Sequence, residues 1–175
     1  DAMGKKTYAT YDGMNNLTGI TNALGHSVKL SYDTRNRLTG MTDPQGNNSS
    51  LTYDANGNIT SINLPNGETI NYAYDQLDRV TSINDISGAI ANFSYDSNSN
   101  ITSYINGTGA NITAEYDSLD RIKKITDPLG NFYLLSYDRN SNITAVTDRN
   151  GFTSNYTYDS LDRVKTMTDN NGFTV

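Results

Sequence analysis

The sequence predicts an all-β protein built as a repetitive antiparallel β-hairpin ribbon. The dipeptide Tyr-Asp recurs with a constant spacing of 21 residues, and a glycine occupies the fifteenth position of the unit that each tyrosine opens. A fixed period of this kind is typical of repeat architectures, in which each unit packs on its neighbours. We therefore expect one hairpin per 21 residues and a ribbon that coils into a β-solenoid or hollow spiral. The tyrosine column is Tyr11, Tyr32, Tyr53, Tyr74, Tyr95, Tyr116, Tyr137 and Tyr158, and the glycine column is Gly25, Gly46, Gly67, Gly88, Gly109, Gly130 and Gly151.

Two chain reversals are expected in each unit. With the tyrosine numbered as position 1, positions 12 to 15 read Asp43-Pro44-Gln45-Gly46 in one unit, and all three prolines of the chain fall at position 13. Asp, Pro and Gly in these places are typical of a type I turn. Positions 3 to 6 predict the second reversal, because position 5 is Gly, Asp, Asn or Ser, which tolerate a left-handed backbone.

Two short strands are expected between the reversals. In the first, positions 18, 20 and 1 place Val28, Leu30 and Tyr32 on one face, and the residues between them are polar. That alternation is typical of a half-buried strand. The second strand covers positions 6 to 11, where the apolar residues at positions 7 and 10 are three apart. Simple alternation does not allow this spacing, so we expect a β-bulge or a change of face.

A second period of 42 residues overlies the first. From the third unit onward, positions 4 to 6 alternate between Asn-x-Asn, as at 56–58, and Leu-Asp-Arg, as at 77–79. One interpretation is the duplication of a two-unit block. The other is that odd and even hairpins have different surroundings, with Leu and Arg packing or pairing where Asn does not. A sheet coiling with an even number of hairpins per turn would produce the second.

The chain is predicted to be one continuous repeat array over residues 1–175. It contains a partial repeat at 1–10, seven full repeats at 11–157 and a partial repeat at 158–175, so we expect a fragment of a longer chain. One such hairpin is too small to fold alone. Unpaired strand edges invite further strands, and the expected partners are further repeats of the same chain or identical chains joined end to end.

Composition restricts the chemistry. Apolar residues make up 35%, there is no Cys and one His, and the net charge is −6. These values argue against a thick core, a zinc or thiol site, and nucleic acid as a partner. No apolar run is long enough for a membrane span. No nucleophile, base and orienting group share a motif, so we expect no catalytic, cofactor-binding or metal-binding residues and no enzyme activity.

The residues from Tyr116 to Ile122 (YDSLDRI) and from Thr126 to Gly130 (TDPLG) closely resemble the YD repeat of the Rhs family. The resemblance covers the whole chain. It implies long β-sheet ribbons that spiral into hollow shells, as in bacterial Rhs and wall-associated polymorphic toxins, the C component of Tc toxins, and teneurins. The unvarying 21-residue spacing departs from the variable repeats of shell proteins and favours a stalk or filament. Asp127-Pro128-Leu129-Gly130 is followed by Asn131 rather than Leu, so we do not expect the family's self-cleavage here.

We accordingly predict a secreted or cell-surface structural segment that serves as a stalk, filament or shell wall. The alternatives are the wall of a shell that encloses a C-terminal toxin domain, and a carbohydrate-binding adhesin repeat that engages cell-wall or cell-surface glycans through the tyrosines or the Thr/Asn/Ser face.

Two columns of polar residues have alternative interpretations of their own. The aspartates after the tyrosines suggest turn capping more than a calcium ladder, because their spacing matches neither the EF-hand loop nor the nonapeptide calcium repeat. Ten Asn-x-Ser/Thr sequons occur, and the recurrent Asn-Ile-Thr predicts candidate glycosylation in a row at Asn58, Asn100 and Asn142.

Overall fold

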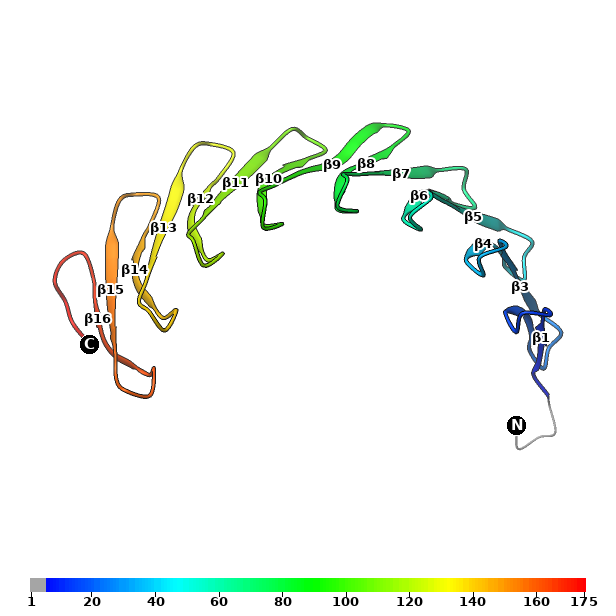
Figure 1. The fold of residues 1–175 in the computed structure, drawn as a ribbon, viewed down its shortest axis with the longest axis horizontal. Helices are drawn as coiled ribbons and strands as arrows, with labels where there is room; N and C mark the ends of the chain where they lie inside the picture. The colour runs from blue at the N-terminus through cyan, green and yellow to red at the C-terminus, as the bar shows by residue number, and fades with distance from the viewer. Residues whose placement is uncertain (1–5) are drawn as a thin grey trace. The chain divides into compact units, whose positions relative to one another are not determined.

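The computed structural model describes residues 6–175, which form sixteen β-strands and no helix. The strands neighbour one another in sequence order from β1 to β16 in an antiparallel sheet (Figure 1), so the predicted all-β hairpin ribbon is confirmed. Their bounds are β1 Tyr8–Tyr11, β2 Leu17–Thr21, β3 Ser27–Tyr32, β4 Leu38–Thr42, β5 Asn48–Tyr53, β6 Ile59–Asn63, β7 Thr69–Tyr74, β8 Val80–Asp85, β9 Gly88–Tyr95, β10 Ile101–Asn106, β11 Asn111–Tyr116, β12 Ile122–Thr126, β13 Phe132–Tyr137, β14 Ile143–Thr147, β15 Thr153–Tyr158 and β16 Val164–Thr168. No helix of the described part could cross a membrane.

The contacts divide the chain into two compact units, residues 1–90 and 91–175, and each is described by itself. Both are built from the same 21-residue hairpin. The single continuous array over residues 1–175 therefore remains a prediction.

A β-bulge in each hairpin explains the apolar pair at positions 7 and 10. In the hairpin of β5 and β6, Thr52 is opposite Ser61 and Tyr53 is opposite Ile59, so Thr60 is the additional residue. The same shift recurs between the two strands of the other hairpins. A bulge places one extra residue opposite a single partner. Ile59 and Ile62 therefore share the face that carries Tyr53, as the predicted bulge requires.

The two reversals of a unit have the same backbone geometry. In the glycine turn, at positions 12 to 16, Gly46 N–H donates to the Asp43 carbonyl at 3.0 Å and Asp43 N–H donates to the Asn47 carbonyl at 2.9 Å. Gly46 has φ of +88°. The arrangement is a type I turn followed by a left-handed residue, a common hairpin connection.

The Tyr-Asp turn, at positions 2 to 6, repeats these bonds. Asp120 N–H donates to the Asp117 carbonyl at 3.1 Å, Asp117 N–H donates to the Arg121 carbonyl at 2.8 Å, and Asp120 has φ of +59°. The left-handed residue at position 5 is confirmed. The expected start at position 3 is wrong by one residue, because the aspartate at position 2 is itself the first residue of the turn.

The sheet is one layer thick. Its apolar face carries positions 1, 7, 10, 18 and 20, paired across strands as in Leu51 with Ile62 and Ile62 with Ile70. Most of these side chains are half-buried, others such as Ile112 are exposed, and Ala91 is the one buried hydrophobic residue among residues 6–175. The opposite face is polar, with hydroxyl and amide pairs such as Thr69 to Asn63 at 2.7 Å. The predicted lack of a thick core is confirmed.

Backbone pairing between successive hairpins covers only part of each strand. From β4 to β5 the register contains three pairs, which begin at Thr42 with Asn48 and end at Gly40 with Ser50. Within the next hairpin, by contrast, pairing continues to Tyr53 with Ile59. The part of each hairpin nearest the Tyr-Asp turn therefore needs other contacts to hold it to the preceding hairpin.

Candidate functional site: the inter-repeat ladder

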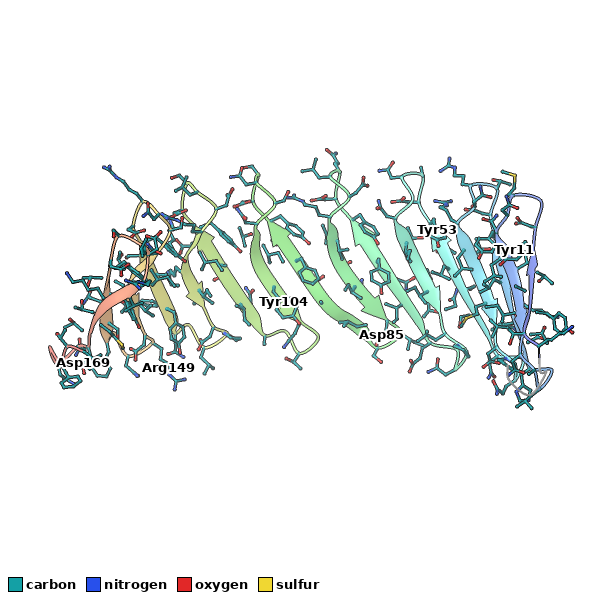
Figure 2. The ribbon with its side chains drawn as sticks, turned by 90° about the horizontal axis from the view of Figure 1, so that it is seen from below. Tyr11, Tyr53, Asp85, Tyr104, Arg149 and Asp169 are labelled. Atoms are coloured by element: carbon teal, nitrogen blue, oxygen red, sulfur yellow. The ribbon has the colours of Figure 1, made fainter. Side chains whose placement is uncertain are left out.

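Side chains at the Tyr-Asp turns join each hairpin to the next where backbone pairing has ended. We call this set of contacts the inter-repeat ladder. Within residues 1–90, the ladder lies at the edge of the sheet near Tyr11 and Tyr53, whereas Asp85 lies at the opposite edge, that of the glycine turns (Figure 2). Within residues 91–175, Arg149 and Asp169 likewise belong to glycine turns.

The tyrosine column supplies the first contact of the ladder. Tyr137 Oη donates to the carbonyl of Ile122, the position 7 residue of the preceding unit, at 2.8 Å. The same bond, 15 residues back along the chain, is made by Tyr53, Tyr74, Tyr116 and Tyr158 at 2.6–2.9 Å. Burial raises the pKa of Tyr74, which further favours the protonated hydroxyl that donates this bond. These rings are half-buried with their hydroxyls engaged, which suits a structural role better than a sugar-binding stripe.

Even units reach the next odd unit through an arginine at position 6. Arg121 Nε and Nη2 both bind Oδ2 of Asp117 in its own turn at 2.7 Å, and Nη1 donates to the carbonyl of Asp138 in the next turn at 2.9 Å. The guanidinium carbon lies 4.5 Å from the centre of the Tyr137 ring, within cation–π range. Arg37 stands in the same way over Tyr53, at 4.4 Å.

Odd units reach the next even unit through two asparagines. Asn58 Nδ2 donates to Oδ2 of Asp54 in its own turn at 3.0 Å and to Oδ1 of Asp78 in the next turn at 2.6 Å. Asn56 Nδ2 donates to the same Asp78 oxygen at 2.8 Å. The pattern repeats further along, where Asn98 and Asn100 donate to Asp120 and where Asn140 and Asn142 donate to Asp162.

The 42-residue period therefore coincides with two kinds of junction that alternate along the ribbon. Arg pairs in the even units as expected, but Asn pairs as well, through a different set of acceptors. The expectation that Leu packs at position 4 is wrong, because Leu77, Leu119 and Leu161 are 62–70% exposed. A short turn that projects beyond a single-layer sheet has no second layer for these side chains to pack against.

The aspartate at position 2 caps its own turn. Asp117 Oδ1 accepts the backbone N–H of Leu119 at 2.9 Å and of Arg121 at 3.1 Å, which confirms the expected Asx turn. The hydrogen bond from the Arg121 side chain is the main cause that lowers the pKa of Asp117. The side-chain hydrogen bond from Asn58 does the same for the pKa of Asp54. Within residues 6–175, no three His, Cys, Asp or Glu side chains are grouped as metal ligands.

The remaining predicted site residues lie at both edges of the sheet. The column glycines lie at the glycine turns with φ of +81° to +127°. Asn58, Asn100 and Asn142, the candidate glycosylation sites, lie in the ladder, and each uses Nδ2 to bind two turns at once. A glycan on Nδ2 leaves the amide with one hydrogen, so glycosylation at these positions and an intact ladder exclude each other.

Sequence reasoning missed the role of position 5. Its left-handed backbone was foreseen, but its side chain also accepts bonds from the preceding unit, as Asp78 and Asp120 do from asparagines and Ser141 does from Arg121 at 3.2 Å. A signal was available, because position 5 is Asn or Asp in every even unit, where the preceding unit offers asparagine amides.

Comparison with known proteins agrees with this architecture. The family model described as RHS Repeat matches residues 11–48, 53–90, 116–153 and 137–174, which together exceed half of the chain. No curated protein matches.

Solved structures share the fold. The crystal structure of TcdB2-TccC3-Cdc42 has a TM-score of 0.67 and 22% identity over 90% of this chain. TcdB2-TccC3 without its hypervariable C-terminal region has a TM-score of 0.65 and 22% identity over 90% of this chain. The Photorhabdus luminescens Tc holotoxin pore has a TM-score of 0.62 and 18% identity over 93% of this chain. The chain spans only 10–12% of the length of these neighbours. It has the fold of a structural repeat segment.

Proposed function

Because the chain belongs to the RHS repeat family, we propose that it is a non-enzymatic, extracellular wall segment of a shell built from a longer β-ribbon. The observation that carries this proposal is the inter-repeat ladder, in which the same kinds of contact recur from one Tyr-Asp turn to the next and commit tyrosine, aspartate, asparagine and arginine side chains to holding hairpins together. The similarity to structures of TcdB2-TccC3 supports it.

The partners of such a segment are further hairpins. Arg163 is 72% exposed, whereas Arg37 and Arg121, which reach a following turn, are 25% and 20% exposed. We propose that its guanidinium binds a following Tyr-Asp turn, which further repeats of the same chain or an identical chain would supply. Isolated 175-residue chains are therefore expected to associate with increasing concentration in sedimentation velocity.

Electron microscopy of the full-length polypeptide that contains this segment tests the proposed wall. We expect a closed, hollow particle within which the C-terminal sequence resists added protease. The matched sample replaces Arg37 and Arg121 with Ala, and we expect it to lose protease resistance at a lower temperature. An extended rod whose C-terminal sequence is cleaved at once would overturn the shell.

The second candidate is a stalk or filament, favoured by the constant 21-residue spacing. Identical units stack with an identical rotation, and this geometry suits an open ribbon more readily than a tapered, closed one. The rod described above is the outcome that this candidate predicts. Specific, saturable binding on a glycan array that Tyr74→Ala abolishes without unfolding would instead support an adhesin.

A further inference from the structure

One of the five Asn-Gly pairs lies differently in its turn from the other four. In those four, the glycine is the left-handed fourth residue and its N–H donates to the first carbonyl of the turn at 2.9–3.3 Å. The four pairs are Asn56-Gly57, Asn66-Gly67, Asn150-Gly151 and Asn171-Gly172. In the fifth, Asn106 is the first residue of the turn and Gly107 is the second, because Gly109 N–H donates to the Asn106 carbonyl at 2.9 Å.

Two nitrogens at this turn are free of partners in the part of the chain that the structure describes. The backbone N–H of Gly107 donates to no acceptor there, and neither does Nδ2 of Asn106. Gly107 also lacks a Cβ that would crowd its own nitrogen. A backbone nitrogen that is neither bonded nor shielded lies next to a side-chain amide whose leaving nitrogen is equally unrestrained.

Three donors converge on the other atom of that amide. Oδ1 of Asn106 accepts from Thr108 N–H at 3.0 Å, Thr108 Oγ1 at 2.7 Å and Ala110 N–H at 3.0 Å. Donors aimed at a carbonyl oxygen stabilise the negative charge that develops there when a nucleophile adds to the carbonyl carbon. The turn therefore polarises Cγ of Asn106 toward attack.

We propose that Asn106 is a self-modifying site that deamidates through a cyclic imide. The Gly107 nitrogen attacks Cγ of Asn106, a new N–Cγ bond forms, the Cγ–Nδ2 bond breaks, and the Gly107 proton leaves with Nδ2 as ammonia. Water then adds to one of the two imide carbonyls and the ring opens. Hydrolysis at Cγ gives aspartate, and hydrolysis at the backbone carbonyl gives isoaspartate.

The aspartate product fits the ribbon. Asp43, Asp127, Asp148 and Asp169 already occupy this position of the glycine turn, where Oδ1 accepts the same two backbone N–H groups. Isoaspartate instead lengthens the main chain by one carbon at the junction of β10 and β11. Aspartate should therefore leave the turn unchanged, whereas isoaspartate should disturb the glycine turn between β10 and β11.

Peptide mapping by mass spectrometry of the 175-residue chain, incubated at pH 8.5, tests the proposal. In the folded chain we expect the gain of one mass unit to form at Asn106 at least about ten times faster than at the other four asparagines, a difference of about 1.4 kcal/mol in barrier. In denaturant the five rates should converge. Equal rates at all five sites in the folded chain, or a slower rate at Asn106, would overturn the proposal.

Three controls test the roles of Gly107 and Thr108 separately. Asn22 lies in the same turn position with the same backbone donors but is followed by Ala23, so it should deamidate more slowly than Asn106. Gly107→Ala should lower the deamidation rate at Asn106 to that of Asn22. Thr108→Val removes one donor to Oδ1 and should slow the reaction by about two- to tenfold. An unchanged or faster rate in Thr108→Val would refute the polarisation of Cγ.

Discussion

The two turns of each unit share one backbone geometry but differ in what occupies their left-handed residue. The glycine turns have Gly there, with open space where a Cβ would lie at Gly46 and Gly130. The Tyr-Asp turns have Asn, Asp or Ser in all but one described unit, at φ of +57° to +74°. A non-glycine residue in this region costs about 1–2 kcal/mol.

This difference in the left-handed residue indicates which edge of the ribbon depends on side-chain contacts between hairpins. At the glycine turns the neighbouring hairpins are already joined by backbone pairs, so the least strained residue suffices. At the Tyr-Asp turns those pairs have ended, and the side chain of Asp78 or Asp120 is needed as an acceptor for the preceding unit. The ladder contacts offset the cost of the strained backbone.

The largest effect is expected when the Tyr-Asp turn of an even unit receives the sequence of an odd unit. Replacing Leu119-Asp120-Arg121 by Asn-Ser-Asn exchanges the carboxylate that accepts from Asn98 and Asn100 for a shorter hydroxyl, and it removes the guanidinium over Tyr137. We expect a loss of about 3 kcal/mol in urea unfolding, because two junctions fail at once. The same exchange at 161–163 alters one described junction and should cost about half as much. Equal, negligible losses would favour duplication as the origin of the 42-residue period.

A bulky residue at the glycine turn tests the other edge. Gly109→Val forces a β-branched side chain into φ of +81°, and we expect a loss of about 2 kcal/mol from backbone strain alone, since no atom lies near the added Cβ. Lys29→Ala on the exposed polar face should change stability by less than about 0.5 kcal/mol. Identical melting temperatures for the two variants would contradict the assigned turn.

A single arginine measures one junction. Arg121→Ala should cost about 1–2 kcal/mol, through the lost cation–π contact and the lost bond to the Asp138 carbonyl. Arg163 makes the same bonds within its own turn but is 72% exposed, so Arg163→Ala is the matched control and should cost clearly less. The difference in urea midpoint between the two variants reports the junction.

Acid should loosen the Tyr-Asp turns. Hydrogen bonds from Arg and Asn side chains hold the pKa values of Asp54, Asp75, Asp117 and Asp159 below the ordinary 3.8. A lowered pKa in the folded state stabilises the fold above the unfolded value, and this contribution is lost as the pH falls through the folded value. Thermal melts should therefore be flat from pH 7 to 5 and fall below about pH 4. Asp117→Asn should reduce that acid dependence, and an unchanged profile would contradict it.

The smallest effect is expected at the one Tyr-Asp turn that has glycine. Gly57→Ser should place a hydroxyl near Arg37, as Ser141 does for Arg121, and an added Cβ would lie 3.8 Å from Arg37 Nη1. The new acceptor and the left-handed strain oppose each other, so stability should change by less than about 0.5 kcal/mol. A loss as large as that of Gly109→Val would show that the two turns are equivalent after all.

Much of the fold is predictable from the sequence, because Pro44 and Gly46 predict their turn directly. The alternation of apolar and polar residues around Tyr32 predicts its strand. The spacing of Ile59 and Ile62 was enough to foresee the bulge. The ladder was only half foreseen. Pairing of the arginine at position 6 was expected without a named partner. Its place over Tyr137 depends on how far backbone pairing extends between hairpins, and no local sequence pattern indicates that extent.

The ladder also bears on how the ribbon forms in time. Its hydrogen bonds join residues 15 to 22 apart in the chain, as in Tyr137 to Ile122 and Asn56 to Asp78. Chains with local contacts fold fast, and domains fold from the N-terminus as they are synthesised. Each hairpin can dock on its predecessor as soon as about 20 further residues have emerged. A ribbon of any length can thus grow in one direction without waiting for its far end.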